Sequence, residues 1–419
     1  MNKDYLFLLD SYCFIWKDPD HILIYNTLSG KGYIYANVPV LCDFVDKLML
    51  KDNLYSISVS SQELSNKSVA DFIYSMRENF CGDLFSRDAF QGKPIVLFPE
   101  MNINEDVNRN LDDINSSAVF GSTILRNLTD IYLELGGSCK YDCKDCSDVY
   151  RQIEWCYRSD RVMPVEIVNK IFEDIKYANV FDLHFIGGNL LNYPFWDDLL
   201  FLISTYAEVS DVSMNFNINV KGFRDTCYRD KINDLLHLVN VHLKVYIDFS
   251  DLSEDLYTIL LNLKDKAEFF FRVVDEKQAL CVSEFSNSLD IEFTILPYYT
   301  GNNMSFFKKY VFMGKDDILD SSLSKKDIFS HQVLNANYFG KLYVKANGDI
   351  CSNLISSPIG SYQEGLLKIV YEELKKGTFW RKTRDQVEPC RDCLYKYLCP
   401  SPSTYEEAIG QYNLCDLKD

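Results

Sequence analysis

The chain has 419 residues, 47% of them hydrophobic, enough for roughly two to four folded units, and this excludes a disordered tail protein. Its 61 acidic residues outnumber 43 basic ones, so the net charge of -18 repels nucleic-acid backbones and anionic lipid headgroups. No apolar stretch approaches the ~18 residues of a membrane-spanning helix, and Asp10 interrupts the short apolar run at the amino terminus. We therefore expect a cytoplasmic protein whose partners include neither nucleic acid nor a membrane.

The first 85 residues mix strand-like and helix-like segments. Apolar and aromatic runs predict strands over residues 5–9, 22–25, 33–35 and 55–59. Apolar residues recur at helical spacing over residues 41–49 and 69–76. This pattern predicts a small α+β module over residues 1–85. The periodicity then fades over residues 86–127, which we interpret as a linker.

A different pattern of apolar residues begins at residue 128 and continues to about residue 320. Short apolar strands, including residues 131–135 and 182–186, alternate with longer amphipathic helices. About six β-α units in series predict an α/β fold with a parallel sheet, curled into a full or partial barrel. In such sheets the chemistry lies at the carboxyl ends of the strands. The last segment, residues 321–419, contains a hairpin signal at Asn347-Gly348 followed by a cysteine-rich tail.

Fourteen cysteines in a chain of this length are better explained by metal binding than by disulfides, because the cytosol keeps thiols reduced. Seven of them fall into two tight groups, whereas the others stand mostly alone in apolar surroundings. The groups are Cys139, Cys143 and Cys146, and then Cys390, Cys393, Cys399 and Cys415.

The first group places three thiolates on one loop, directly after a strand and a Gly136-Gly137 turn. A structural zinc site has four protein ligands, whereas an iron–sulfur cluster held by three cysteines keeps one iron open for a small molecule. The spacing favours the cluster. A zinc site closed by Cys156, and thiols without any metal, are the alternatives.

The CxxxCxxC spacing on the first strand-to-helix loop resembles the motif of the radical SAM superfamily, over about residues 128–320. The resemblance implies a partial (β/α)6 barrel and a 4Fe-4S cluster on Cys139, Cys143 and Cys146 that chelates S-adenosyl-L-methionine (SAM). It also implies that Gly187, Gly188 and Asn189 seat the methionyl group of SAM.

This chain departs from the superfamily pattern at two positions. Asn189 replaces the usual glutamate, so a charge-assisted contact to SAM becomes a neutral one of roughly half the strength. Asp145 replaces the usual aromatic residue before the third cysteine. Two polar residues that end a later strand, Asp248 and Ser250, are candidates to face the ribose of SAM or are solvated strand-end residues.

The four cysteines of the tail resemble the SPASM extension of radical SAM peptide-modifying enzymes, which carries auxiliary 4Fe-4S clusters in a domain opened by a β-hairpin. The resemblance implies one auxiliary cluster on Cys390, Cys393, Cys399 and Cys415, with zinc as the alternative metal. Cys351 matches a ligand of a second auxiliary cluster. Because Ser403 and Gly365 replace other expected ligands, we expect that second cluster to be absent.

Residues 1–85 resemble the winged-helix-like module that binds the leader of a ribosomally made precursor peptide as an added strand; a purely structural cap is the alternative. Over the whole chain the sequence is most similar to the pseudo-radical-SAM proteins of GG-Bacteroidales peptide-modification systems. The resemblance implies either of two functions in peptide maturation. One is SAM cleavage and hydrogen abstraction, and the other is a catalytically degenerate partner that binds precursor peptide and a companion radical SAM maturase.

Overall fold

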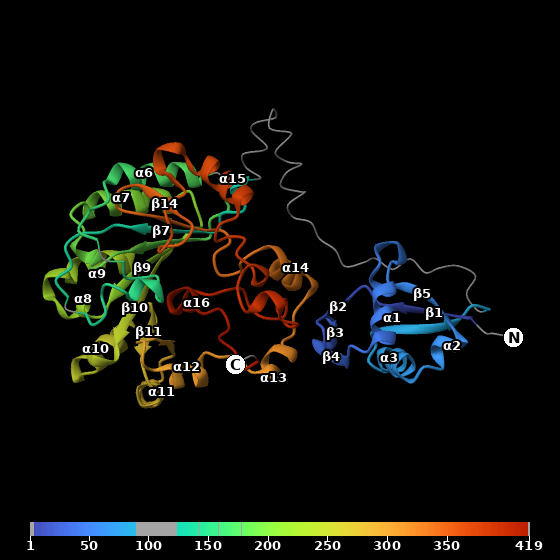
Figure 1. Cartoon of the computed structure of the whole chain (residues 1–419). Helices are drawn as coiled ribbons and strands as arrows, with labels where there is room; N and C mark the ends of the chain where they lie inside the picture. The colour runs from blue at the N-terminus through green and yellow to red at the C-terminus, as the bar shows by residue number, and fades with distance from the viewer. Residues whose placement is uncertain (1–3, 89–123, 142, 158, 177, 418–419) are drawn as a thin grey trace.

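The computed structural model describes residues 4–88, 124–141, 143–157, 159–176 and 178–417. Most of the predicted linker, residues 89–123, lies outside these described residues. Figure 1 shows an N-terminal part and a larger body built on a curved sheet, with α14 (Lys325–Val333) and α16 (Thr404–Ile409) of the C-terminal segment between them.

The N-terminal part contains two antiparallel sheets and three helices. One sheet has the order β5-β1-β6 and the other the order β2-β3-β4. The helices cover them, and the buried faces of α1 and α3 carry the apolar residues that helical spacing predicts. The elements are β1 (Asp4–Leu9), β2 (Cys13–Lys17), β3 (His21–Asn26), β4 (Lys31–Ala36), α1 (Pro39–Met49), β5 (Ser56–Ser60), α2 (Ser61–Leu64), α3 (Lys67–Glu78) and β6 (Gly82–Ser86).

The larger body is built on a sheet of nine strands, in the order β12-β11-β10-β9-β8-β7-β13-β14-β15. Strands β7 to β12 are all parallel and lie side by side in chain order, which confirms the predicted parallel sheet. They are β7 (Asp130–Glu134), β8 (Asp182–Ile186), β9 (Ser213–Asn219), β10 (Val241–Asp248), β11 (Ala267–Val273) and β12 (Phe293–Pro297). Figure 1 shows helices on the outer side of this curved sheet.

The outer helices connect successive parallel strands and bury their apolar stripes against the sheet. The principal ones are α6 (Val165–Ile175), α7 (Trp196–Ala207), α9 (Arg229–His237), α10 (Glu254–Leu263) and α11 (Glu276–Leu289). Shorter helices are α8 (Lys221–Arg224), α12 (Met304–Tyr310), α13 (Lys315–Leu319) and α14 (Lys325–Val333).

The C-terminal segment continues the same sheet. Strand β13 (Lys341–Val344) pairs parallel to β7, and β14 (Asp349–Cys351) returns antiparallel to β13, as the hairpin signal at Asn347-Gly348 predicts. The segment then forms β15 (Gly360–Ser361), α15 (Leu366–Lys376) and α16 (Thr404–Ile409). The hairpin therefore belongs to the central sheet.

The two faces of the central sheet differ in chemistry because successive side chains of a strand point to opposite faces. The helix-covered face is an apolar core. The other face buries polar and aromatic groups, among them Glu134, His184, Asn217, Asn219, Asp248 and Arg272. On that face Tyr132 stacks between Tyr343 and His184, with ring centroids 4.5 and 4.3 Å apart.

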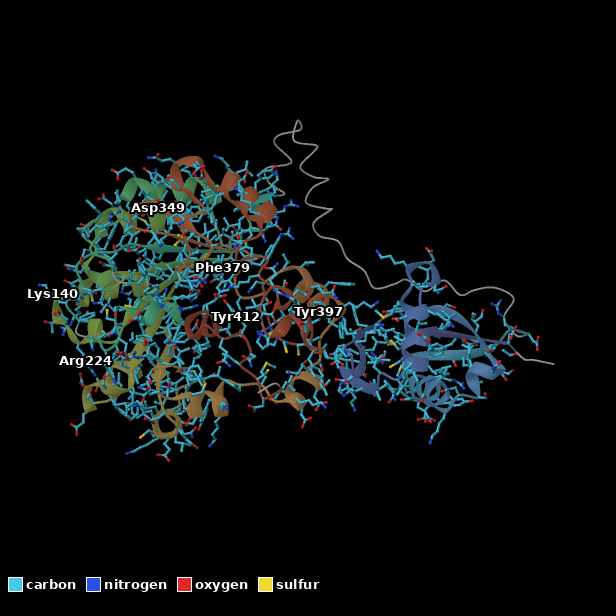
Figure 2. The ribbon with its side chains drawn as sticks, viewed as in Figure 1. Lys140, Arg224, Asp349, Phe379, Tyr397 and Tyr412 are labelled. Atoms are coloured by element: carbon cyan, nitrogen blue, oxygen red, sulfur yellow. The ribbon has the colours of Figure 1, made fainter. Side chains whose placement is uncertain are left out.

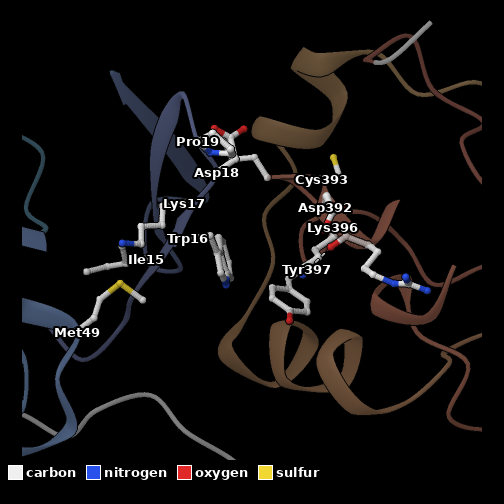
Figure 3. A pocket seen from close by; sticks show the side chains of 12 residues that line it. Ile15, Trp16, Lys17, Asp18, Pro19, Met49, Asp392, Cys393, Lys396 and Tyr397 are labelled. Carbon is white, nitrogen blue, oxygen red and sulfur yellow. Dashed lines mark hydrogen bonds between the residues drawn. The ribbon is translucent and has the colours of Figure 1, made fainter. Parts of the chain in front are cut away.

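The N-terminal part packs against the C-terminal segment through the β2-β3-β4 sheet. Phe14 contacts Phe329, and the Leu323 backbone N–H donates to the Tyr25 hydroxyl at 2.8 Å. Beside this contact lies a groove of about 580 Å³, in which Trp16 faces Tyr397 (Figure 3). This packing covers one face of the sheet, since Phe14, Leu23 and Ile34 from its three strands share an apolar cluster with the C-terminal segment.

The helices offer no candidate for a membrane span: within the described residues, none is both long and apolar enough to cross a bilayer.

Candidate metal and cofactor sites

The first cysteine group begins where β7 ends in a tight glycine turn. Gly136 has a left-handed φ of +68°, and a Cβ atom there would lie 1.9 Å from the carbonyl oxygen of Arg161. The Gly137 N–H donates to that same oxygen at 3.1 Å. The turn thus requires glycine and directs the cysteine loop across the carboxyl end of the sheet.

Cys139 packs directly on the glycine turn that follows β8. A Cβ atom on Gly188 would lie 2.7 Å from the Cβ atom of Cys139. Gly187 has φ of +150°, and a Cβ atom there would lie 3.2 Å from the backbone nitrogen of Gly136. The structure therefore brings the predicted SAM-binding glycines and the predicted cluster loop into contact, and the close approach explains why both positions are glycine.

Cys143 lies beside the ends of β9 and α8. Its Sγ is 3.9 Å from Nδ2 of Asn219 and 3.7 Å from Nζ of Lys221. Burial raises the pKa of the Cys143 thiol to about 11, and the Lys221 ammonium opposes that rise. A bound metal would favour the thiolate at neutral pH.

Asp145, next to Cys146, joins the loop to the strand ends through an ion-pair network. Its backbone has a left-handed φ of +59°, and Oδ2 accepts from Nη1 of Arg272 at 3.3 Å. Nε of the same arginine donates to Asp248, and its guanidinium lies 4.7 Å from the ring centroid of Tyr298. Arg272 is only 6% exposed and Asp248 only 4%.

This network changes the interpretation of two candidate ribose ligands. Asp248 is buried and accepts a hydrogen bond from Arg272, so it is not a solvated strand-end residue. Burial raises the pKa of its carboxyl, and Arg272 opposes the rise. Ser250 is exposed at the surface. Arg272 was not predicted, although a lone arginine within the apolar strand β11 was a signal for it.

Asn189, the predicted contact to the methionyl group, is turned to another partner. Its side-chain N–H donates to the Tyr228 hydroxyl at 3.0 Å, and the residue is only 5% exposed. This bond uses the amide N–H, whereas a methionyl ammonium would need the amide oxygen as its acceptor.

The segment that follows the cysteine loop covers the polar face near the strand ends. Val149 and Ile153 are buried with Tyr246 and Tyr298. The Trp155 ring lies 4.1 Å from that of Phe270, edge to face.

Gln152 fixes this covering segment to the loop after β12. Its side chain donates to the Tyr299 carbonyl at 2.9 Å and accepts from the Tyr299 N–H at 2.7 Å. The segment is thus held by both apolar packing and hydrogen bonds.

Cys156 ends this segment beside the first cysteine group. It lines a cavity of about 10 Å³ with Gly187, Gly188 and Asn219. The neighbouring Cys146 thiol and burial hold the pKa of Cys156 well above its usual range.

The residues near the first group include donors for a metal centre. Three thiols on one loop are suitable donors for an iron–sulfur cluster. The cavity that Cys156 lines has about 10 Å³, the space of about one water molecule. Among the described residues, no three His, Cys, Asp or Glu side chains are arranged closely enough to hold an ion as they stand.

The tail cysteines lie together around a second small cavity. Cys390, Cys393, Cys399 and Cys415 all line a space of about 30 Å³. The sequence-predicted group is thus brought together. Cys351 is not among its lining residues and is buried with Tyr132, Ile186 and Tyr343.

A buried ion pair borders this second cavity. Nη1 of Arg384 lies 3.7 Å from the Cys390 Sγ, and its Nη2 donates to the Glu406 carboxylate at 3.2 Å. Burial raises the pKa of the Cys399 thiol to about 12, with Arg384 opposing the rise. Ser403, at a position where a further cysteine was expected, caps α16 instead.

The two cysteine groups occupy different regions of the molecule. In Figure 2, Lys140 of the first loop lies at the edge of the sheet remote from the N-terminal part, whereas Tyr412 lies between the sheet and that part. The carbonyl oxygen of Tyr412 accepts from the Cys390 thiol at 3.0 Å. The groups would therefore form two separate centres.

Neither a family model nor a curated protein matches the sequence. Solved structures are similar at low identity. SuiB from Streptococcus suis matches with 10% identity and a TM-score of 0.48, covering 98% of this chain and 100% of that one. The same protein bound to S-adenosylmethionine gives 10% identity, a TM-score of 0.46 and 97% coverage of both chains. Native anSMEcpe with bound AdoMet gives 13% identity and a TM-score of 0.44, covering 65% of this chain and 88% of that one. At this level of similarity, the function has to be argued from the residues of the site itself.

Proposed function

We propose that the chain is an iron–sulfur protein of radical SAM/SPASM type that acts in the maturation of a ribosomally synthesised peptide as a catalytically degenerate partner. The observation that carries this proposal is the contact between Cys139 and Gly188 at the carboxyl ends of parallel strands, beside a segment whose Trp155 packs on Phe270 and covers the polar face there. The contact supports a retained cluster loop. The covering segment, together with Asn189 in place of the usual glutamate, supports the loss of SAM chemistry.

In this proposal Cys139, Cys143 and Cys146 bind a first 4Fe-4S cluster, and Cys390, Cys393, Cys399 and Cys415 bind an auxiliary one. When bound, such clusters carry electrons or brace the surrounding loops. Lys221 near Cys143 and Arg384 near Cys390 place positive charge beside each anionic thiolate group. These cations would favour the ligating thiolate forms.

The proposed partner is a precursor peptide, bound as an added strand by the N-terminal part. The β2-β3-β4 sheet has two edge strands, β2 and β4, and the C-terminal segment packs on one face of it. Strand β4 is the edge proposed for the peptide, because its residues are largely half-exposed. A companion radical SAM maturase would then act on the captured peptide.

A second candidate is an active maturase that cleaves SAM and abstracts hydrogen from the peptide. The three intact cysteines of the first loop and their contact with the glycine turn favour it. It would require the segment around Trp155 to leave the strand ends.

Anaerobic reconstitution separates these functions. The protein is analysed for iron, zinc and sulfide, and then for 5'-deoxyadenosine by chromatography after addition of dithionite and SAM. We expect two iron–sulfur clusters and no 5'-deoxyadenosine above a Cys143→Ala control. Product above that control would establish the active maturase instead, and zinc without sulfide would refute both functions.

A further inference from the structure

We propose that a groove on the N-terminal part binds a basic residue of the precursor peptide together with the apolar residue beside it. The groove lies between the carboxyl end of α3 and the start of β6, and Phe80 lines it. This inference rests on the proposed function, in which the N-terminal part captures that peptide. It adds the chemistry by which the peptide is selected.

The groove is large enough for several side chains of a peptide. Its volume is about 540 Å³, within the range of about 300–1,000 Å³ that is typical of ligand-binding clefts. Residues of α3, of the turn after it, of the start of β6 and of the turn between β1 and β2 line it. The groove is therefore built entirely within the N-terminal part.

Two aromatic side chains of the groove are exposed to water. Phe80 is 80% exposed and Tyr74 is 46% exposed. Aromatic rings bury a large apolar area when a partner covers them, and they are enriched among the residues that contribute most to binding. The two rings thus provide apolar contact area at one place on the surface.

The backbone holds Phe80 in an unusual conformation. Its φ is +53°, a left-handed value that a bulky side chain rarely adopts. The Phe80 carbonyl accepts from the Tyr12 hydroxyl at 2.7 Å and from the Asn26 side chain at 3.3 Å. These bonds fix the turn that presents the ring to solvent. Binding at a fixed turn costs less conformational entropy than binding at a flexible one.

Carboxylates outnumber cations in this groove. Asp10, Glu78 and Asp83 line it with a single cation, Arg77. Nε of Arg77 lies 2.7 Å from the Asp83 carboxylate, so that pair is neutral. Within the part of the chain that the structure describes, neither Asp10 nor Glu78 pairs with a basic side chain. Two negative charges are therefore available to a ligand.

Asp10 also has unused capacity to accept hydrogen bonds. The Tyr12 hydroxyl lies 2.9 Å from Oδ2 of Asp10, and the same hydroxyl bonds the Phe80 carbonyl. A hydroxyl has only one hydrogen to donate, so the two acceptors share it. A cationic donor from a ligand would satisfy the carboxylate more fully.

A lysine or arginine next to an apolar residue fits both features of the groove. Its cation would pair with Asp10 and Glu78, and a cation also binds to the face of an aromatic ring. Its apolar neighbour would cover part of the Phe80 ring. An acidic segment is repelled by the same carboxylates, and the net charge of -18 adds to this selection.

The groove is adjacent to the strand that we propose for the peptide. Asn26, which bonds the Phe80 carbonyl, is the register partner of Lys31, the first residue of β4. Helix α3 is bound to the same strand, since the hydroxyl oxygens of Tyr35 and Ser75 are 2.6 Å apart. A peptide paired with β4 that continues past Lys31 therefore comes to the groove, which favours the precursor peptide as its occupant.

Peptide binding to the full-length protein tests the inference. The probes are short fluorescein-labelled peptides of glycine and serine with a central lysine-phenylalanine-lysine sequence. In one control peptide glutamates replace both lysines, and in the other alanine replaces the phenylalanine. Fluorescence anisotropy measures the dissociation constants at low and at high salt.

We expect the lysine-phenylalanine-lysine peptide to bind more tightly than both controls, and less tightly at high salt. Phe80→Ala should weaken its binding about tenfold, as the loss of an aromatic anchor does. The matched variant is Phe201→Ala, which removes a phenylalanine that is 70% exposed on α7 and should leave binding unchanged.

A charge reversal tests the groove without removing the Phe80 ring. Glu78→Lys should weaken binding of the basic peptide and strengthen binding of the acidic one. Glu284→Lys makes the same charge change at an exposed position on α11 and should have little effect on either peptide. Circular dichroism checks that each variant is folded.

Several results would overturn the inference. They are equal affinity for the three peptides, no binding of any of them, and equal losses in Phe80→Ala and Phe201→Ala. A dimer in sedimentation velocity that Phe80→Ala abolishes would also overturn it, since the groove would then be a contact between two copies of the chain.

The metal content shows which level of the account fails. Protein that loads zinc without sulfide but binds the basic peptide selectively would refute the iron–sulfur function and leave the groove as a peptide site. Protein that loads clusters but does not distinguish the peptides would refute the groove and leave the iron–sulfur function.

Discussion

The guanidinium of Arg272 donates a hydrogen bond to the carboxylate of Asp145, 3.3 Å away, and so ties the cysteine loop to strand β11. Arg272 also binds the buried Asp248. One guanidinium thereby pairs with two carboxylates near the first cysteine group, one of which is the acidic residue that precedes Cys146.

Replacing Arg272 by methionine should destabilise the protein strongly. Removing one partner of a buried ion pair leaves the other uncompensated, so we expect the free energy of unfolding to fall by about 3–5 kcal/mol. Chemical denaturation measures the change. Arg77→Gln, which breaks the exposed Arg77–Asp83 pair (2.7 Å), should cost about 1 kcal/mol or less. Equal losses in the two variants would contradict the structural role of Arg272.

A methyl group at Gly188 should disturb the first centre. In Gly188→Ala the added Cβ would lie 2.7 Å from that of Cys139, so we expect about 1–3 kcal/mol of destabilisation and a lower iron content at that centre. Gly314→Ala is the control, since the methyl there meets only the flexible Asp317 carboxylate at 3.3 Å. Full iron loading of Gly188→Ala would contradict the contact.

Arg384 should stabilise the tail and raise the reduction potential of the auxiliary cluster. Arg384→Gln removes a buried positive charge beside Cys390 and leaves Glu406 unpaired. We expect the free energy of unfolding to fall by about 3–5 kcal/mol and the midpoint potential to become more negative, as measured by redox titration monitored by electron paramagnetic resonance (EPR). Arg391→Gln on the same loop breaks an exposed pair with Glu388 and a hydrogen bond to the Asp385 carbonyl, and should leave the potential unchanged. An unaltered potential in Arg384→Gln would place the cluster elsewhere.

His184 should make stability depend on pH. Burial lowers its pKa below the usual value near 6.5, although Asp130 opposes the shift. Below pH 6.5 His184 is protonated in the unfolded chain but stays neutral in the folded protein. The free energy of unfolding therefore decreases as pH falls, until the pKa of His184 in the folded protein is reached. We expect His184→Gln to flatten this slope in denaturation curves between pH 7 and pH 5. The exposed His242→Gln variant should retain the slope, and a loss in both would assign the effect to other groups.

Much of the fold was predictable from local patterns. The parallel strands β7 to β12 followed from alternating apolar runs and helical stripes, and Asn347-Gly348 predicted the hairpin. Both cysteine groups were predictable because their members are close in sequence. Strand β2 was missed, since its five residues (Cys13–Lys17) are a short run without a turn signal like that at Ser29-Gly30.

The contacts that decide the chemistry of the site were not predictable, because they join distant residues. Arg272 meets Asp145 across 127 positions, and only the folded sheet brings them together. The sequence indicated Cys156 only as an alternative zinc ligand. Nothing in its spacing shows that the chain after Cys146 turns back and places Cys156 beside the cysteine loop. The hydrogen-bond partner of Asn189 is Tyr228, which lies 39 positions further along the chain.

The EPR spectrum of the reduced, reconstituted protein with and without SAM tests the central claim most directly. The account predicts an iron–sulfur signal that SAM leaves unchanged, because the segment around Trp155 covers the strand ends beside Gly188. A shift of that signal on adding SAM, absent in Cys143→Ala, would contradict the account and identify an open iron that binds SAM.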